Sequence, residues 1–366
     1  MRENSIASKT RWLLLGAIML ALAVGAIFVI VRSSNRKNLQ QTDPHQALAS
    51  LATKSLYFNG PARPWLLTQR PDLLADEDRN EKSERSRRFA QAVENPKLFR
   101  QLDRQYRFDT LLLIGDPSQY RELLEHLLEA NDWTLTYLDH AALIYKRDGA
   151  HVWQPADFEA VVASFPTPRG QATCLAQAAM KLLAIRRATD AKTLLDRAER
   201  LDQTVPDLWN ALAIYRMNRG EWKSATTHAD RALEIEANFL PALATKTQIL
   251  FSTKKFADAY QSSSRLIAAH PNDPGLLFYH AKICHQARAF SAEIQALQRL
   301  IRRAESEGQP ATGYRVYLAQ AFAADGQARP SIEEFKRVLA DPEISREQRK
   351  FAEDTLAQVK SRSGVD

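Results

Sequence analysis

Apolar residues recur at a fixed spacing of 34 positions in the carboxyl-terminal half of the chain. The spacing is seen in Trp222, Phe256 and Phe290 and, ten positions further on, in Ala232, Leu266 and Leu300. Such a period, with large and small apolar residues at fixed offsets, predicts a stack of two-helix units. These units bury their apolar faces only by stacking, and the stack offers a long concave surface. The pattern therefore predicts binding rather than catalysis.

About five such units are predicted over residues 171–343, followed by a capping helix and tail over 344–366. The units begin near Ala172, Pro206, Leu240, Pro274 and Thr312, the last after a four-residue insertion at 306–310. We expect alanines at the repeated offsets to let the helices of a unit cross closely, and Trp222, Phe256 and Phe290 to fill the groove between them. The helix predicted over 346–361 would cover the open apolar end of the stack.

Residues 55–150 have a different pattern, which predicts a small α/β domain. Short apolar or alternating runs at 55–59, 109–115, 133–138 and 141–145 indicate strands. Helical spacing over 79–107, interrupted at Pro96, predicts two helices, and Asp116 and Pro117 begin another. Residues 151–170 form a bridging segment, in which a helix is expected over 157–165 and ends at Pro166 and Pro168.

Residues 12–31 contain no charged side chain and are bracketed by Arg11 and Arg32. Twenty helical residues span roughly 30 Å, the thickness of a hydrocarbon core, so this run predicts one transmembrane helix between a short tail (1–11) and a linker (32–54). A cleaved signal peptide is the alternative, but its apolar run would be shorter. Basic residues are equally frequent on the two sides of this run, so their distribution does not indicate the orientation of the helix. The short tail before the run favours an exported, periplasmic placement of the larger part of the chain. A cytoplasmic placement stays open.

The net charge of +7 is mild, and its basic residues are scattered among acidic ones. Without a Lys/Arg block interleaved with aromatics, we expect no nucleic-acid partner. The two cysteines, Cys174 and Cys284, fall in different repeats inside predicted helices, so we expect them to be small buried residues rather than a disulfide.

The sequence offers little that suggests catalysis. The eight histidines show neither the HExxH spacing nor CxxC partners of a metal site, and Ile114 to Gln119 lacks the glycines of a phosphate-binding loop. We therefore expect no metal, no cofactor and no enzymatic activity.

The repeats resemble tetratricopeptide (TPR) repeats, because their large and small residues recur in phase over several units. The resemblance implies a mainly α, TPR-type solenoid whose units line a concave groove with their first helices. Carried over position by position, it implies a protein-binding groove at Asn210, Ile214, Met217, Gln248, Phe251, Phe278, Lys282 and His285. Several apolar members of this set could instead pack between repeats. Asn210 and Lys282 have the residue types of the carboxylate clamp of some family members, but the set is incomplete.

Residues 55–148 resemble the soluble domain that follows the membrane helices of many bacterial multi-pass glycosyltransferases. The matching residues are Trp133, Tyr137, Asp139, Ala142, Tyr145 and Arg147, and the first turn departs from the pattern at Asn59, Gly60 and Arg63. The catalytic part of those enzymes lies in membrane helices that this sequence does not contain. The resemblance therefore implies an extracytoplasmic accessory domain.

Taken together, the sequence predicts a single-pass, membrane-anchored bacterial scaffold that assembles or regulates a cell-envelope complex through protein partners. Self-association is left open. The alternative is an accessory subunit of a glycosyltransferase or polysaccharide synthesis or export system, with a substrate-binding α/β domain.

Overall fold

The computed structural model describes residues 53–364 except 116, 131, 148, 150 and 343. The predicted tail (1–11), the predicted transmembrane helix (12–31) and nearly all of the predicted linker (32–54) lie outside these residues. Within the described part, no helix is both long and apolar enough to cross a bilayer. The chain divides into two compact units, the first ending at Thr245 and the second beginning at Lys246.

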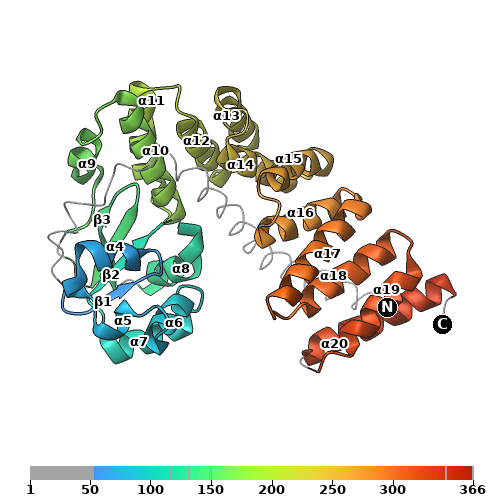
Figure 1. Cartoon of the computed structure of the whole chain (residues 1–366). Coiled ribbons are helices and arrows are strands. Elements are labelled where there is room, and N and C mark those ends of the chain that lie inside the picture. Colours follow the sequence, from blue (N-terminus) through green and yellow to red (C-terminus); the bar gives the residue numbers. More distant parts are fainter. Residues whose placement is uncertain are drawn as a thin grey trace. The chain divides into compact units, whose positions relative to one another are not determined.

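A four-stranded sheet forms the amino-terminal part of the first unit (Figure 1). Its strands follow the order β1-β2-β4-β3 and comprise β1 (Leu56–Phe58), β2 (Thr110–Ile114), β3 (Trp133–Leu138) and β4 (Ala142–Arg147). β1 and β2 pair in parallel, and the other neighbours are antiparallel. All four predicted strands are confirmed. β2 and β4 bury both faces, which explains why their sequences are continuous apolar runs rather than alternating ones.

Five helices accompany this sheet, and a capping side chain marks the start of two of them, α6 and α7. They are α4 (Ala62–Gln69), α5 (Asp76–Arg79), α6 (Glu84–Ala92), α7 (Pro96–Tyr106) and α8 (Arg121–Ala130). The predicted division at Pro96 is confirmed, because the Asn95 side chain accepts a hydrogen bond from the Leu98 amide and begins α7. The sequence did not indicate α4. Its prolines Pro61 and Pro64 stand at the helix start, where no backbone donor is needed.

The predicted helix over 157–165 is shorter than expected. Residues Pro155–Phe158 form a 3₁₀ turn and α9 spans only Glu159–Ala163. Pro168 does not end this helix. It occupies the first position of α10, after Thr167, whose hydroxyl accepts from the Gly170 amide. The core runs without interruption from Leu56 to Tyr215, so the sheet and the first helical hairpins are packed as one body.

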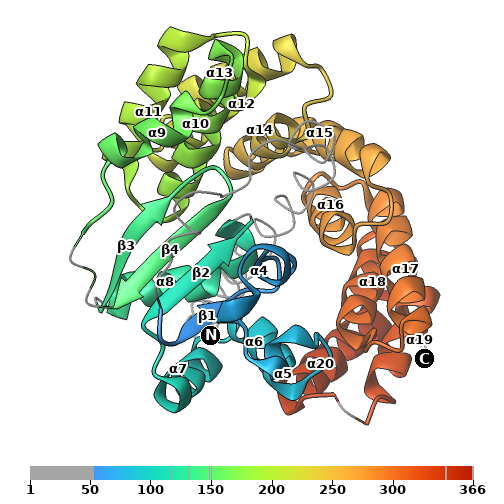
Figure 2. The ribbon, with the colours of Figure 1, turned by 60° about the vertical axis from the view of Figure 1, so that its left-hand side comes forward.

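Consecutive helical hairpins make up the rest of the chain. In the first unit these are α10 (Pro168–Ala184), α11 (Ala188–Leu201), α12 (Pro206–Asn218) and α13 (Trp222–Ile235), and α14 (Leu240–Ser252) contains the unit boundary. The second unit continues with α15 (Phe256–Ala269), α16 (Pro274–Gln286), α17 (Phe290–Ser306), α18 (Thr312–Ala324), α19 (Ala328–Leu339) and α20 (Arg346–Ser363). The predicted starts at Pro206, Leu240, Pro274 and Thr312 are confirmed. Figure 2 shows α16 and α18 in one layer of the second unit, with α17 and α19 in the other.

The large aromatic residue at the start of each second helix does not have the role expected of it. Trp222 is 39% exposed, and Phe256 and Phe290 are only half-buried. Trp222 is the first residue of α13 and is not among the buried residues of that helix, which are Ala225, Ala229 and Ala232. The alanines Ala225 and Ala232 are fully buried. Small residues therefore form the close helix contacts, and the prediction that Trp222 fills the groove is wrong.

Each hairpin turns at one residue in the left-handed backbone region. These residues are Arg186, Gly220, Lys254, Arg288 and Gly326. They repeat the 34-residue period and, after the insertion, are displaced by four positions. Only two of the five are glycine, although the left-handed region costs other residues roughly 1–2 kcal/mol.

Replacing Lys254, an exposed residue at φ 60°, by glycine should therefore stabilise the second unit. We expect Lys254→Gly to raise its free energy of unfolding by about 0.5–1 kcal/mol, after the greater freedom of the unfolded chain is subtracted. Urea denaturation followed by circular dichroism measures this change. Gly220→Lys, at the equivalent turn of the preceding hairpin, should have the opposite sign. A loss of stability in Lys254→Gly would contradict the assignment of strain to this turn.

The predicted capping helix is confirmed as α20. It begins with a capping box between Ser345 and Gln348 and packs against α19. Only Ala352 is fully buried among its residues, which matches a helix with one covered face and one polar face.

Candidate functional site

The candidate groove residues of the first unit are largely used in packing. Asn210 is buried in α12, where its carbonyl oxygen accepts a hydrogen bond from the Thr245 hydroxyl (2.8 Å). Its amide nitrogen faces the Met180 sulfur at 3.7 Å. Ile214 is buried, and Met217 packs against the same core. These contacts hold α10, α12 and α14 together and leave little of the three side chains for a partner.

The first helices of the second unit carry half-buried aromatic rings instead. Phe251 of α14 meets the ring of Tyr279 edge-on, with centroids 6.1 Å apart. Phe278 of α16 makes similar contacts with Tyr314 (5.6 Å) and Tyr317 (5.2 Å) of α18. We call the half-buried residues Phe251, Phe278, Tyr314 and Tyr317 the aromatic strip.

The two tyrosines of the aromatic strip were missed in the sequence. A signal existed: once the four-residue insertion is subtracted, the position equivalent to Phe278 is Val316, which lies between Tyr314 and Tyr317. The insertion moves the fifth unit out of the strict 34-residue spacing, and at the equivalent position the aromatic rings stand on either side of a valine.

Lys282 lies one turn after Phe278 on the same helix. Its ammonium nitrogen is 5.9 Å from the centroid of the Phe278 ring, within cation–π range. Burial lowers the pKa of Lys282 to about 8. Gln248, the remaining candidate on α14, is half-buried. The second unit thus presents aromatic surface and a lysine that is charged at neutral pH and easily neutralised.

His285 lies in the last turn of the same helix and is paired with a residue of its own chain. Its Nδ1 lies 3.1 Å from both carboxylate oxygens of Glu293, a buried residue of α17. Hydrogen bonding to this carboxylate raises the pKa of His285. The imidazole therefore neutralises a buried acid, and this pairing accounts for its position without a partner.

A buried chain of polar side chains connects α15 and α16 and was not predicted. Ser263 donates its hydroxyl proton to the Tyr260 carbonyl (3.0 Å), so it must accept from Nδ1 of His280 (2.8 Å). Nε2 of His280 is then free to accept from the Cys284 thiol (3.3 Å). The geometry fixes the proton on Nδ1. Burial, with a smaller effect from the Arg299 charge, lowers the pKa of His280 to about 4.

Both cysteines are buried and free, as expected. Burial raises the pKa of Cys284 to about 12, and it also raises that of Cys174. A neutral imidazole and an inaccessible thiol are suited to structure rather than nucleophilic chemistry. Among the described residues, no group of histidine, cysteine or acidic side chains is arranged to hold a metal ion.

The residues that carry the glycosyltransferase resemblance stabilise the β3–β4 hairpin. Asp139 accepts hydrogen bonds from the amides of Ala141 and Ala142 (2.6 Å each) and from the Tyr137 hydroxyl (2.7 Å). The guanidinium of Arg147 lies 4.4 Å from the Trp133 ring centroid, and it forms ion pairs with Asp103 and Asp132. These intramolecular contacts give Tyr137, Asp139 and Arg147 a role in stabilising the fold, which is sufficient to explain their presence.

No protein-family model matches the chain, and no curated protein matches it. Among solved structures, MamA 41-end from Desulfovibrio magneticus RS-1 is 19% identical and aligns over 46% of this chain and 93% of its own, with a TM-score of 0.39. YrrB, described as a TPR protein with an unusual peptide-binding site, is 12% identical over 49% of this chain and 90% of its own (TM-score 0.41). PilF of Pseudomonas aeruginosa is 16% identical over 54% and 88% (TM-score 0.41). From its own helices and periodicity, the chain is mainly helical, with a small amino-terminal sheet and TPR-like repeats.

Proposed function

We propose that this chain is a scaffold that binds a polypeptide segment of another protein on the first helices of its repeats. The observation that carries the proposal is the aromatic strip with Lys282 beside it. Aromatic side chains that are partly covered and rigid offer large contact area at little entropic cost, and they dominate binding energy at protein interfaces. The segment we expect has apolar side chains for Phe278 and Tyr317 and a carboxylate for Lys282.

The proposal also specifies where in the cell the chain is located and which kind of complex it acts on. We propose that residues 12–31 anchor the chain in the bacterial inner membrane and that the repeats act in the periplasm on a cell-envelope complex. The support is the uncharged run of twenty residues and the short tail before it. Alkaline phosphatase fused to the carboxyl end should be active in intact cells. An inactive phosphatase fusion, with an active cytoplasmic reporter at the same position, would reverse the orientation.

The lowered pKa of Lys282 makes binding depend on pH. A carboxylate binds the charged ammonium, and with a pKa of about 8 that form is abundant at pH 7 and scarce at pH 9. We therefore expect the affinity for the bound segment to fall about tenfold between pH 7 and pH 9. Photocrosslinking from a probe at Gln248, described in the Discussion, identifies the bound segment. Isothermal titration of the full chain in detergent with a peptide of that sequence then measures the change in affinity.

The matched variant is Lys282→Arg, which keeps its charge throughout this range. Its affinity should stay constant between pH 7 and pH 9, whereas Lys282→Met should bind weakly at both. If the wild-type chain and Lys282→Arg respond to pH in the same way, Lys282 does not contact the segment.

A further inference from the structure

The first helices of the second unit carry a row of hydrogen-bond donors beside the aromatic strip. Gln248 of α14, Lys282 of α16 and Gln320 of α18 are 34 and 38 residues apart, so they occupy the same position of three repeats once the four-residue insertion is subtracted. Equivalent positions of stacked repeats lie in line across the stack. We call these half-buried residues, Gln248, Lys282 and Gln320, the donor row.

No acidic side chain stands on the three helices that carry the aromatic strip and the donor row. α14, α16 and α18 contain no Asp or Glu, and their Lys and Arg residues are Lys246, Lys282 and Arg315. An ammonium group only donates hydrogen bonds, and a glutamine amide has two N–H donors. Within the described part of the chain, no hydrogen bond or ion pair involves the side chains of Gln248 and Gln320. These helices therefore offer donors and positive charge to a ligand that carries acceptors and negative charge.

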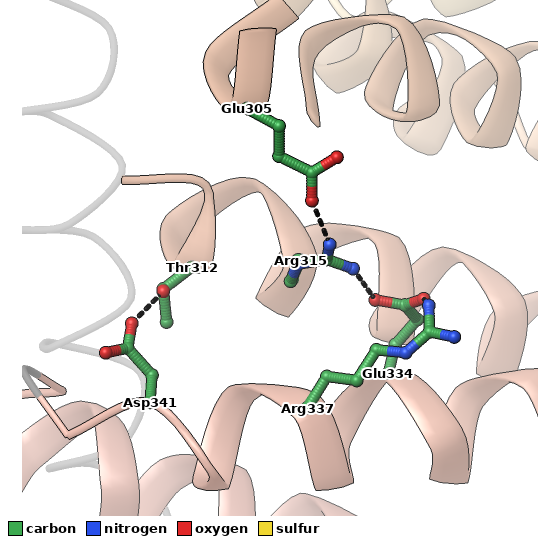
Figure 3. A network of polar contacts seen from close by, with 6 residues as sticks. All are labelled: Glu305, Thr312, Arg315, Glu334, Arg337 and Asp341. Atoms are coloured by element: carbon green, nitrogen blue, oxygen red, sulfur yellow. Dashed lines mark hydrogen bonds and ion pairs between the residues drawn. The ribbon is translucent and has the colours of Figure 1, made fainter. Parts of the chain in front are cut away.

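Ion pairs fix the position of α18 and of the two tyrosines that it contributes to the aromatic strip (Figure 3). Arg315, which lies between these tyrosines in the sequence, pairs with Glu305 of α17 and with Glu334 of α19, the latter at 2.8 Å. Thr312, the first residue of α18, donates a hydrogen bond to the Asp341 carboxylate. Because α18 is fixed against its neighbours, a ligand that binds its rings loses little affinity to the cost of ordering them.

The spacing of the donor row matches that of a polyproline II (PPII) helix. Packed helices lie roughly 8–10 Å apart, and the ring contacts of Phe278 with Tyr314 and Tyr317 show that α16 and α18 are neighbours. A PPII helix rises about 9 Å in each turn of three residues, so residues one turn apart meet successive first helices. An α-helix repeats about every 5.4 Å and one face of a strand about every 7 Å, so neither has this period.

The chemistry of a proline-rich segment also matches this surface. Proline has no backbone N–H, so such a segment presents carbonyl acceptors to the donor row. Its PPII conformation is formed before binding, and aromatic-lined grooves are the surfaces that recognise it. Because a PPII helix has three edges, one edge can place carbonyls and carboxylates on the donor row while the adjacent edge places prolines on the aromatic strip.

On the basis of the scaffold function proposed above, we propose that the aromatic strip and the donor row together bind a proline-rich segment of another protein in the PPII conformation. Prolines of the segment pack on Phe278 and Tyr317. Its carbonyl oxygens accept hydrogen bonds from Gln248 and Gln320, and an aspartate or glutamate of the segment pairs with Lys282.

Two fluorescently labelled peptides test the preference for PPII. Four repeats of Pro-Pro-Glu form a PPII helix with the glutamates along one edge, and four repeats of Ala-Ala-Glu carry the same charge without that conformation. Anisotropy measures their affinities for the full chain in detergent. Gln320→Glu introduces a carboxylate into the donor row with little change of shape, and Gln261→Glu, at an exposed position of α15, is the matched control. Circular dichroism confirms that each variant is folded.

We expect the Pro-Pro-Glu peptide to bind the wild type at least tenfold more tightly than the Ala-Ala-Glu peptide, because its conformation is ordered beforehand. Gln320→Glu should lower the affinity of the Pro-Pro-Glu peptide at least tenfold, since the new carboxylate repels its acceptors. Gln261→Glu should change this affinity less than twofold. The proposal is overturned if the Pro-Pro-Glu peptide does not bind, if it binds no more tightly than the Ala-Ala-Glu peptide, or if the two substitutions have equal effects.

The segment that crosslinks to a probe at Gln248 separates this proposal from the scaffold function. A proline-rich segment supports both. A crosslinked segment without proline overturns the PPII assignment and leaves the scaffold function standing, whereas the absence of any adduct contradicts the scaffold function on which the assignment rests.

Discussion

Replacing Phe335 by alanine should lower the free energy of unfolding of the second unit by about 3–5 kcal/mol. Phe335 of α19 is completely buried against Ala319, Val338 and Ala352, and side chains of α20 close over it. Removing its ring takes away apolar contact from three helices and leaves a cavity. Because each repeat is stabilised by its neighbours, the loss should unfold α18 to α20 before the rest.

Hydrogen exchange with mass spectrometry measures this effect helix by helix. Trp222→Ala is the matched control, since that ring is exposed and should contribute less than about 1 kcal/mol. Phe335→Leu, which retains most of the volume, should lose no more than about 1.5 kcal/mol. Equal losses for Phe335→Ala and Trp222→Ala would contradict the assignment of Phe335 to the core and of Trp222 to the surface.

Acidification should destabilise the second unit through His280. The pKa of its imidazole is about 4 in the folded chain and about 6.5 in an unfolded one. The unfolded chain therefore binds a proton first, and stability that is fully present above pH 6.5 is lost as the pH falls toward 4. For a pKa difference of this size the loss is roughly 3 kcal/mol.

Urea denaturation at half-unit pH steps, for the wild type and His280→Gln, isolates this contribution. His280→Gln should be less stable at pH 7, because the buried hydrogen bonds are disturbed, but its stability should fall less steeply below pH 6.5. His285→Gln is the control. Glu293 raises the pKa of His285, so protonated His285 stabilises the fold at low pH. Replacing His285 should therefore not reduce the loss of stability that the wild type shows below pH 6.5. If the free energy of unfolding falls equally steeply with decreasing pH in the wild type and in His280→Gln, His280 is not a buried neutral imidazole.

The starts of the repeats could be predicted because they depend on local signals. Pro206 and Pro274 occupy first helical positions, and the alanine offsets recur with the hairpin. The left-handed turn residues share the same period but were not recognised, since Arg186, Lys254 and Arg288 carry no glycine signal. Trp222 was misassigned because periodicity marks equivalent positions and does not reveal how deeply each one is buried.

The candidate groove residues divide into some that are partly exposed and others that are buried. Phe251, Phe278 and Lys282 lie on the first helices of the second unit with part of their surface exposed. Asn210 and Ile214 have equivalent positions in an earlier repeat but are buried, because contacts with Thr245 and the core use them. Burial depends on which side chains the adjacent repeat supplies, and the period of one repeat does not contain that information.

Two further features could be recognised only in the folded structure. His280 and Cys284 are four residues apart on one helix, so their contact could have been expected, but Ser263 comes from the preceding helix. The ion pairs of Arg315 with Glu305 and Glu334 bring together α17, α18 and α19. The sequence contains these charged residues but does not show which of them pair.

Site-specific photocrosslinking from Gln248 in living cells is the most direct test of the central claim, that the first helices of the repeats bind another polypeptide. A benzoylphenylalanine at Gln248 should yield one discrete adduct whose partner is identified by mass spectrometry. The same probe at Lys336, on the exposed face of α19, should not yield it, and Phe278→Leu combined with Tyr317→Leu should abolish it. The claim is contradicted if Gln248 gives no adduct, or if the adduct is unaffected by the loss of both rings.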